Sequence, residues 1–252
     1  MLKTRLIPLL LLKEGRMVKG KRFRDFRDTG DPVSAARIYN AQNADELMFI
    51  NIGDDAAVGD SFVRTIEKVA KECFMPLTVG GGIDSIDTIH RLVRSGADKV
   101  LINTAALDSP ELVKEAGDSF GRQCIVVGID VYKEGGQHVV HSNRFGRRRE
   151  VSWRDHLLRM QDLGAGEILV NSIDRDGMME GYDLEFIREA SRLVDIPVIA
   201  CGGAGNFQHL LDAIEKGEAH AVACASLFHF GDNNPIRARA FLKNHGVPVK
   251  LV

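Results

Sequence analysis

The chain has 252 residues, of which 44% are hydrophobic and 27% are charged. This composition is close to that of an average globular domain and excludes a disordered or fibrous protein. The net charge of −2 provides no global basic field for nucleic acid or a membrane surface. The apolar segment Leu6–Leu12 is too short to span a bilayer, and charged residues rather than a cleavage site follow it. We therefore expect a cytoplasmic protein with reduced cysteines and no membrane partner.

Short apolar runs bounded by Gly, Pro, Asp or Asn recur eight times along the chain. They lack polar alternation, as buried strands of a parallel sheet do. The predicted strands are Leu6–Leu12, Leu47–Ile50, Leu77–Val79, Val100–Ile102, Ile125–Ile129, Ile168–Val170, Val198–Ala200 and Ala221–Cys224. Helical periodicity lies between them, for example over Ser85–Val93 and Phe207–Ile214. This alternation predicts an α/β fold, a single (β/α)8 TIM barrel over residues 1–252, rather than an open doubly wound sheet.

Several segments of the chain recur at an offset of 121 residues. The clearest pair is Pro76–Gly82 and Pro197–Gly203, each followed by a helical pattern and a further glycine. Because more than one segment shares the offset, the sequence predicts an internal repeat of two half-barrels, about residues 1–121 and 122–252.

Two glycine pairs, Gly81-Gly82 and Gly202-Gly203, follow the third and seventh predicted strands. In a (β/α)8 barrel the C-terminal strand ends carry the active site. Backbone N–H groups at a glycine turn can approach an anion, and a helix N-terminus favours phosphate. Further donors at neighbouring strand ends are Asn103, Thr104, Ala225 and Ser226. We expect two phosphate sites and a small-molecule substrate with a phosphate at each end; the alternative is that the glycines only form tight turns.

Two basic loops are predicted on the same face, and they begin with the similar triplets Lys13-Glu14-Gly15 and Lys133-Glu134-Gly135. Their cations are Arg16, Lys19, Lys21, Arg22, Arg24 and Arg27 after the first strand, and Arg144, Arg147, Arg148 and Arg149 after the fifth. Such loops suit a phosphorylated ligand, although scattered surface charge accounts for most of them. The aromatic residues Phe23, Phe26 and Phe145 interleave with the cations, but the acidic balance argues against nucleic acid.

Carboxylates near strand ends are the candidates for acid–base chemistry: Asp130 after the fifth strand, and Asp174 and Asp176 after the sixth. Asp130 ends an apolar strand, where burial raises a carboxyl pKa and suits proton transfer near neutral pH. A carboxylate that only caps a loop is the alternative. The scattered histidines and the absence of a metal-binding motif predict no metal, and no cofactor is expected.

Four charged residues stand at strand starts, on the opposite face of the predicted barrel: Arg5, Glu46, Lys99 and Glu167. Their alternating signs predict a ring of ion pairs at the barrel base. Considered alone, such a ring is a stabilising device.

Together these residues resemble the cyclase subunit of imidazole glycerol phosphate synthase over essentially the whole chain. The matching stretches are Gly30–Pro32, Ala44–Leu47, Leu77–Ile83, Gly96–Val100, Ile102–Ala106, Gly166–Leu169, Asp174–Gly177, Gly202–Gly205 and Phe228–Phe230. The resemblance implies a barrel that receives ammonia from a separate glutaminase docked on its base, through a central tunnel gated by the charged ring. It implies a bis-phosphate substrate, with imidazole glycerol phosphate and an aminoimidazole carboxamide ribotide as products.

The same resemblance implies roles for individual residues. Lys19 matches the lysine of a mobile loop, Asp176 and Gly177 match substrate-binding positions, and Asp98 and Gln123 match positions near the glutaminase interface.

The departures from the family lie at the reaction centre. The family's cyclase uses two aspartates; Asp130 matches the second, but Leu11 stands at the first and cannot exchange a proton. Asn51 replaces an aspartate, and Asn171 and Cys201 replace small hydroxyl residues. This pattern resembles paralogues that, with their own glutaminase, provide ammonia for acetamidino modification of surface-polysaccharide sugars.

Three hypotheses follow. The first is an ammonia-delivering paralogue that serves sugar amidination with its glutaminase and a third protein, an amidotransferase. The second is a genuine cyclase of histidine biosynthesis that tolerates Leu11. The third is a non-catalytic scaffold or glutaminase activator.

Overall fold

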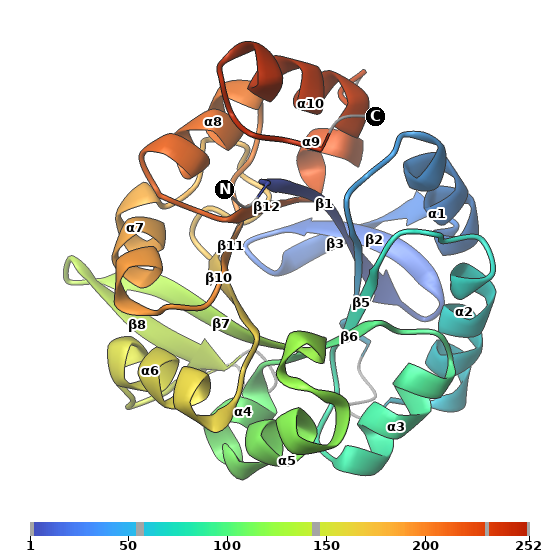
Figure 1. Cartoon of the computed structure of the whole chain (residues 1–252), viewed down its shortest axis with the longest axis vertical. Helices are drawn as coiled ribbons and strands as arrows, with labels where there is room; N and C mark the ends of the chain where they lie inside the picture. Colours follow the sequence, from blue (N-terminus) through green and yellow to red (C-terminus); the bar gives the residue numbers. More distant parts are fainter. Residues whose placement is uncertain (1–2, 54–57, 143–146, 230–231, 251–252) are drawn as a thin grey trace.

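The structure is a computed structural model that describes residues 3–53, 58–142, 147–229 and 232–250. Within these residues, eight parallel strands close into a barrel (Figure 1). The barrel strands are β1 Arg5–Lys13, β4 Leu47–Asn51, β5 Leu77–Gly80, β6 Lys99–Ile102, β7 Ile125–Glu134, β10 Glu167–Ser172, β11 Val198–Cys201 and β12 Ala221–Cys224. Each predicted strand falls on one of them, so the predicted (β/α)8 barrel is confirmed.

The strands follow one another around the barrel in chain order. Strand β1 pairs with β12 on one side and with β4 on the other, which joins the first and last strands. In the middle of the chain, β7 pairs with β10 in a register that places Asp130 opposite Asn171. The C-terminal ends of all these strands therefore meet at one end of the barrel.

Helices surround the barrel (Figure 1). They are α1 Pro32–Ala41, α2 Asp60–Ala70, α3 Ile86–Arg94, α4 Thr104–Asp108, α5 Glu111–Phe120, the short 3-10 helix η1 Arg122–Cys124, α6 Trp153–Leu163, α7 Leu184–Leu193, α8 Phe207–Glu215, α9 Ser226–His229 and α10 Pro235–Asn244. Helix α3 begins one residue later than predicted because Ser85 is its N-cap and accepts a hydrogen bond from the backbone N–H of Thr88. No helix among the residues that the structure describes is long and apolar enough to cross a membrane.

Apolar residues form two separate clusters, one inside the barrel and one between the strands and the helices. Alternation along β1 shows the division: Leu6, Leu10 and Leu12 pack under the helices, whereas Ile7 and Leu9 face the barrel interior. The inner cluster consists of Ile7, Leu9, Leu11, Val18, Met48, Leu101, Val126, Leu169, Ile199, Ala221 and Ala223. The barrel is therefore a packed core with its chemistry at the strand ends.

The two basic segments predicted as loops are antiparallel hairpins. The first comprises β2 Arg16–Lys21 and β3 Arg24–Gly30; the second extends β7 and adds β8 Gln137–Ser142 and β9 Arg147–Arg148. Each begins with a two-residue turn whose central residues have positive φ, a geometry that matches the twist of paired strands. Glu14 and Gly15 have φ of 51° and 75°, and Gly135 and Gly136 have φ of 57° and 80°.

Candidate functional site

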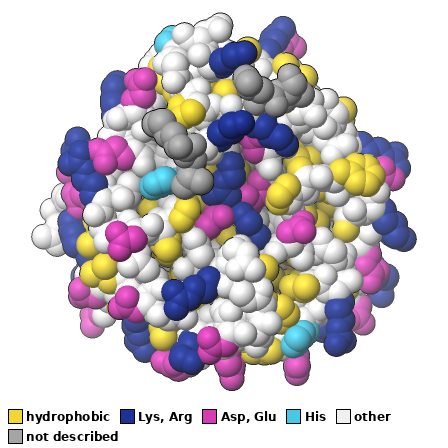
Figure 2. Space-filling model, in the orientation of Figure 1, with side chains coloured by type: hydrophobic (Ala, Val, Ile, Leu, Met, Phe, Trp, Pro, Cys, Tyr) yellow, Lys and Arg dark blue, Asp and Glu magenta, His cyan; other side chains and the backbone are white. Residues whose placement is uncertain are grey.

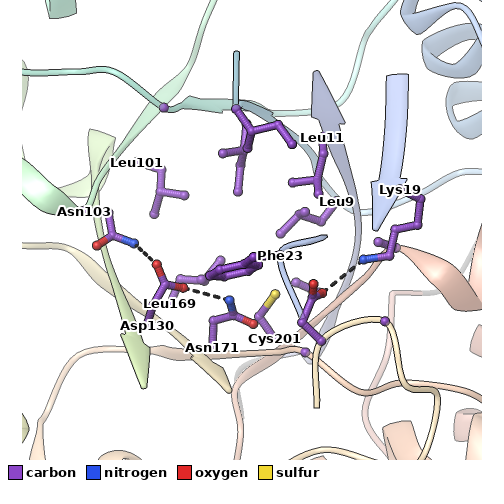
Figure 3. Close-up of a pocket in the computed structure, with 18 of the residues that line it drawn as sticks. Leu9, Leu11, Lys19, Phe23, Leu101, Asn103, Asp130, Leu169, Asn171 and Cys201 are labelled. Atoms are coloured by element: carbon purple, nitrogen blue, oxygen red, sulfur yellow. Dashed lines mark hydrogen bonds and ion pairs between the residues drawn. The ribbon is translucent and has the colours of Figure 1, made fainter. Parts of the chain in front are cut away.

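A cavity of about 470 Å³ lies at the C-terminal ends of the barrel strands (Figure 3). Of the residues predicted for acid–base chemistry, Asp130 and Asp176 line it. The other residues predicted for substrate binding line it too: Lys19, Gly81, Gly82, Asn103, Thr104, Gly177, Gly202, Gly203, Ala225 and Ser226. So do the positions predicted as departures from the cyclase pattern: Leu11, Asn51, Asn171 and Cys201. The fold thus brings residues from both halves of the sequence to one site.

The two glycine turns have backbone conformations that require glycine. Gly81 and Gly82 have φ of 90° and 74°, and Gly202 and Gly203 have φ of 83° and 117°. A Cβ atom on Gly81 would lie 2.0 Å from the backbone oxygen of Asn51, and one on Gly203 would lie 2.2 Å from the backbone oxygen of Gly181. Both turns border the cavity, as do the first residues of α4 and α9.

Two side-chain amides hold the carboxylate of Asp130 (Figure 3). Asn103, which follows β6, donates from Nδ2 to Oδ2 over 2.8 Å, and Asn171 on β10 donates from Nδ2 to Oδ1 over 2.8 Å. Asp130 is only 8% exposed. Burial raises the pKa of Asp130 to about 6, against the two amide hydrogen bonds, which lower it, while the nearby charge of Asp176 adds to the rise. The raised pKa predicted for Asp130 is confirmed.

The carboxylate also fixes the orientation of both amides. An ionised carboxylate only accepts hydrogen bonds, so each amide must turn its NH2 group toward Asp130 and its carbonyl oxygen away. The Oδ1 atoms of Asn103 and Asn171 are buried and have no hydrogen-bond partner among the described residues. The wall around Asp130 therefore contains acceptors that lack a donor.

Lys19 and Asp176 form a buried ion pair at the opposite side of the cavity (Figure 3). The distance from Nζ to Oδ1 is 3.0 Å, and the two side chains are 4% and 12% exposed. The backbone N–H of Arg22 also donates to the backbone oxygen of Asp176 over 2.9 Å. These contacts hold the β2–β3 hairpin against the loop that follows β10.

Asp174 is not an acid–base residue of the cavity, contrary to our expectation. It does not appear in the cavity lining, and its carboxylate accepts a 2.7 Å hydrogen bond from the backbone N–H of Lys133. The partner of this side chain lies in the β7–β8 hairpin, where the sequence predicted a loop. Asp174 is thus a structural cap of the hairpin.

Three of the basic hairpin residues pair with carboxylates outside the cavity lining, which fits the alternative interpretation of surface charge. Arg16 pairs with Asp28, Arg148 with Glu134 and Arg149 with Asp108. Arg144, Phe145 and the side chain of Arg147 lie outside the described residues. Lys19 is the basic residue of this set that lines the cavity.

Part of the cavity lining is apolar and, apart from Leu11, it was not predicted. Leu9, Leu11, Leu101 and Leu169 surround the cavity floor, and Phe23 of the β2–β3 hairpin lies among them (Figure 3). Leu101 packs between two glycines: a Cβ atom on Gly80 would lie 2.8 Å from its Cβ, and one on Gly128 would lie 3.2 Å from its Cδ1. The sequence offered one signal for this lining. Leu9 and Leu169 lie two residues before Leu11 and Asn171 on the same strands, so they point to the same face of the sheet.

The other two polar residues predicted as departures from the cyclase pattern, Asn51 and Cys201, have local environments that account for them. Asn51 accepts a 3.1 Å hydrogen bond from the backbone N–H of Gly53, so its side chain stabilises the start of a loop. Burial raises the pKa of the Cys201 thiol and keeps it protonated near neutral pH.

The predicted ring of ion pairs is present at the other end of the barrel. Arg5 contacts Glu46 and Glu167 at 2.8 Å each, and Lys99 contacts the same two carboxylates at 3.0 and 2.8 Å. Thr78 donates to the second oxygen of Glu46 over 2.6 Å. Figure 2 looks onto the face where the chain termini lie and shows basic and acidic side chains next to one another at its centre.

Directly inside the ring, the barrel contains fully buried apolar side chains. Ile7, Met48, Val126 and Ile199 are each 0% exposed and belong to the inner cluster that separates the ring from the cavity. Around the ring, the predicted interface positions Asp98 and Gln123 are both exposed. The carboxylate of Asp98 accepts a 2.8 Å hydrogen bond from the backbone N–H of Leu77 at the start of β5.

One group of potential metal ligands lies outside the cavity lining: His138, Asp183 and Glu185, with ligand atoms within 4.8 Å of one another. Each has another contact. His138 Nε2 lies 2.9 Å from Asp183, Asp183 caps α7, and Glu185 pairs with Lys133 at 2.8 Å. Through these contacts the three residues form a helix cap joined to an ion pair.

The chain was compared with models of known protein families. A model whose description is "histidine biosynthesis protein" matches residues 5–234. The match extends over all the barrel strands, both glycine turns, Asp130 and the four residues of the ring.

Proposed function

Because this chain belongs to the histidine biosynthesis protein family, we propose that it is the ammonia-accepting barrel of a two-protein amidotransferase, similar to the cyclase subunit of imidazole glycerol phosphate synthase. Its partner in this proposal is a glutaminase bound to the base of the barrel around Asp98 and Gln123. The observation that carries the proposal is the ring of Arg5, Glu46, Lys99 and Glu167 at the opposite end of the barrel from the cavity.

The ring and the apolar layer suit the transfer of ammonia. A closed ring of charges excludes water and ions from the barrel, and neutral ammonia is the form that an apolar layer admits at the lowest desolvation cost. Transfer requires one ion pair of the ring to open and the packed layer of Ile7, Met48, Val126 and Ile199 behind it to move apart. The side chain of Arg5, 24% exposed, faces the proposed partner. In this proposal, glutaminase docking supplies the contacts that open the ring.

The substrate in this proposal is a phosphorylated small molecule. Two glycine turns, at Gly81-Gly82 and Gly202-Gly203, lie on the cavity wall at strands β5 and β11. Glycine lets each turn pack closely against neighbouring backbone, and in this proposal the backbone N–H groups of the turns bind the phosphates. Lys19 adds a cation to the same cavity.

The acceptor of the ammonia differs from that of a two-aspartate cyclase in this proposal. Leu11 contributes an apolar surface where the family has its first aspartate, and the carboxylate of Asp176 is already paired with Lys19. Asp130 is then the carboxylate left for proton exchange. We therefore favour a paralogue that serves amidination of a surface-polysaccharide sugar, with an amidotransferase as the third protein.

The test is the turnover of the family's bis-phosphate substrate with ammonium salt, using the wild type and the Leu11→Asp variant. The paralogue proposal expects no turnover above background by the wild type. It also expects glutamine hydrolysis by the partner glutaminase to rise when the barrel is added, and to rise equally with Asn51→Leu, a cavity control distant from the base. Wild-type turnover that is above background and comparable to that of Leu11→Asp would overturn the paralogue proposal.

A genuine cyclase is the second candidate, and the contact between Asn103 and Asp130 favours it. This pair and the buried Lys19 match the family's positions and lie in one cavity with both glycine turns. For this candidate the wild type turns over the bis-phosphate, and Asp130→Asn abolishes that turnover. If Asp130→Asn changes neither this activity nor the stimulation of glutaminase, the barrel is a scaffold.

A further inference from the structure

Among the described residues, two buried carboxylates line the cavity and one of them has a counter-ion. Asp176 pairs with Lys19 at 3.0 Å. The contacts of Asp130 are the neutral amides of Asn103 and Asn171, and no ion pair involves it within the described ranges 3–53, 58–142, 147–229 and 232–250. A buried charge without a counter-ion costs several kcal/mol unless a ligand supplies the opposite charge.

We propose that the ligand of this cavity presents a protonated nitrogen, an ammonium or amidinium group, to the carboxylate of Asp130. The inference rests on the proposed function because it names the chemical class of the group held at that site. Asn103 and Asn171 are positioning residues: they fix the carboxylate plane and leave the reaction to Asp130.

The hydrogen-bonding capacity around Asp130 fits such a group. Each carboxylate oxygen accepts one amide hydrogen bond at 2.8 Å, and an ionised carboxylate has about four lone-pair sites, so acceptors remain. The buried carbonyl oxygens of Asn103 and Asn171 lack donors within the described part of the chain. A nitrogen cation carries only donors and satisfies acceptors of both kinds.

The apolar side chains around the cavity floor select against a second charge on the ligand at this depth. Leu9, Leu11, Leu101 and Leu169 offer no hydrogen bond. The cationic nitrogen therefore lies at the side of Asp130, and the part of the ligand that faces Leu11 is apolar or small. Phosphate groups are left to the two glycine turns at the cavity rim.

The experiment is a pH titration of the Asp130 carboxyl carbon by NMR in the full-length barrel labelled with [13C]aspartate. The Asp130→Asn variant assigns the signal. The probes are methylammonium chloride and, at equal ionic strength, tetramethylammonium chloride, which carries the same charge without an N–H donor. By linkage, a cation that binds the ionised form lowers the apparent pKa.

We expect saturating methylammonium to lower the apparent pKa of Asp130 by at least about half a unit, with a clearly smaller effect of tetramethylammonium. Equal shifts with both salts overturn the proposal, because they reflect ionic strength alone. A pKa below about 4 without any probe also overturns it, because the ionised carboxylate would then be stable without a ligand cation. The glutaminase is not needed, so failure here is distinct from failure of ammonia transfer.

Two variants make the positioning role testable. Asn171→Leu removes one donor and is expected to weaken the methylammonium effect. Asn244→Leu, at the exposed end of α10 and outside the cavity lining, is the matched control and is expected to preserve it. If Asn171→Leu does not fold, Asn171→Ala serves in its place, because it also lacks a donor. An unchanged methylammonium effect in the folded Asn171 variant overturns the positioning role.

Discussion

Asn171 and Asp130 lie opposite each other on the neighbouring strands β10 and β7, and the amide of Asn171 donates to Oδ1 of Asp130 over 2.8 Å. Register alone places the two side chains on the same inward face, so the contact needs no loop to form it. The residue at position 171 therefore acts directly on the protonation of Asp130.

Asn171→Leu is expected to raise the pKa of Asp130 above its present value of about 6, because the ionised form loses one of its two donors. A hydrogen bond to a charged group contributes about 1.5–3 kcal/mol, which corresponds to a rise of about 1–2 units. The carboxyl NMR titration measures it directly. An unchanged pKa in Asn171→Leu, with Asn244→Leu as the matched control, would contradict the prediction.

The raised pKa of Asp130 also predicts a pH dependence of stability. The native pKa is about 6 against an ordinary value of 3.8, so the native state binds more protons between these values. The contribution of Asp130 to stability is fully present below about pH 4 and is lost as the pH rises through about 6, by about 3 kcal/mol in total. Urea denaturation of the wild type and Asp130→Asn at pH 4.5 and 7.5 measures this contribution as the difference in their free energies of unfolding. A difference that does not change with pH would contradict the prediction.

The ring at the base predicts a loss of stability when one cation is removed. Arg5→Met leaves Glu46, whose side chain is 1% exposed, and Glu167 with Lys99 alone. Breaking such a buried ion pair from one side costs about 3–5 kcal/mol. Arg37→Met is the control, because its pair with Glu72 is exposed; thermal unfolding should show a clear fall in Tm for Arg5→Met and almost none for Arg37→Met.

The same variant has a pH signature. Burial raises the pKa of Glu167, but the hydrogen bonds and charges of Arg5 and Lys99 outweigh burial and hold it below the ordinary value of 4.5. The stabilisation from Glu167 is therefore present above about pH 4.5 and is lost as the pH falls. Arg5→Met should show a shallower decline in acid than the wild type, and an identical decline would argue against this assignment.

Alanine substitutions at two glycines with positive φ, Gly136 and Gly203, are expected to reduce stability by different amounts. Gly136→Ala places a side chain at a φ of 80° with nothing within 4 Å, so only the backbone conformation opposes it, by about 1–2 kcal/mol. Gly203→Ala adds a clash, because its Cβ would lie 2.2 Å from the backbone oxygen of Gly181, and we expect about 1–3 kcal/mol more. Urea denaturation of both variants measures the difference; equal losses would mean that the turn has room for a side chain.

The barrel and most of its cavity could be predicted because their signals are local. Buried parallel strands are continuous apolar runs, and the residue that ends each run, such as Asp130, lies at the active end by topology. The ring followed from the same reasoning applied to strand starts, as Arg5 and Glu167 show. The position of a side chain at a strand end can be predicted once the strand itself is placed correctly.

The features of the site that could not be predicted depend on contacts between strands and within hairpins. That Asn171 donates to Asp130 follows from register, which sequence periodicity does not supply. The segment after β1 was predicted as a loop because its charges mask the alternation of a hairpin, and the role of Asp174 was wrong for the related reason that its partner lies in the β7–β8 hairpin. Phe23 could not be placed in the cavity without the fold of that first hairpin.

The charged ring is unequally divided between the two stretches of chain that meet there. Arg5, Glu46 and Lys99 precede residue 121, whereas Glu167 alone follows it. If the two stretches were produced as separate polypeptides, the first would carry one surplus positive charge at its base and the second one bare carboxylate. Their reassociation would neutralise both, so complementation between fragments should weaken as salt concentration rises.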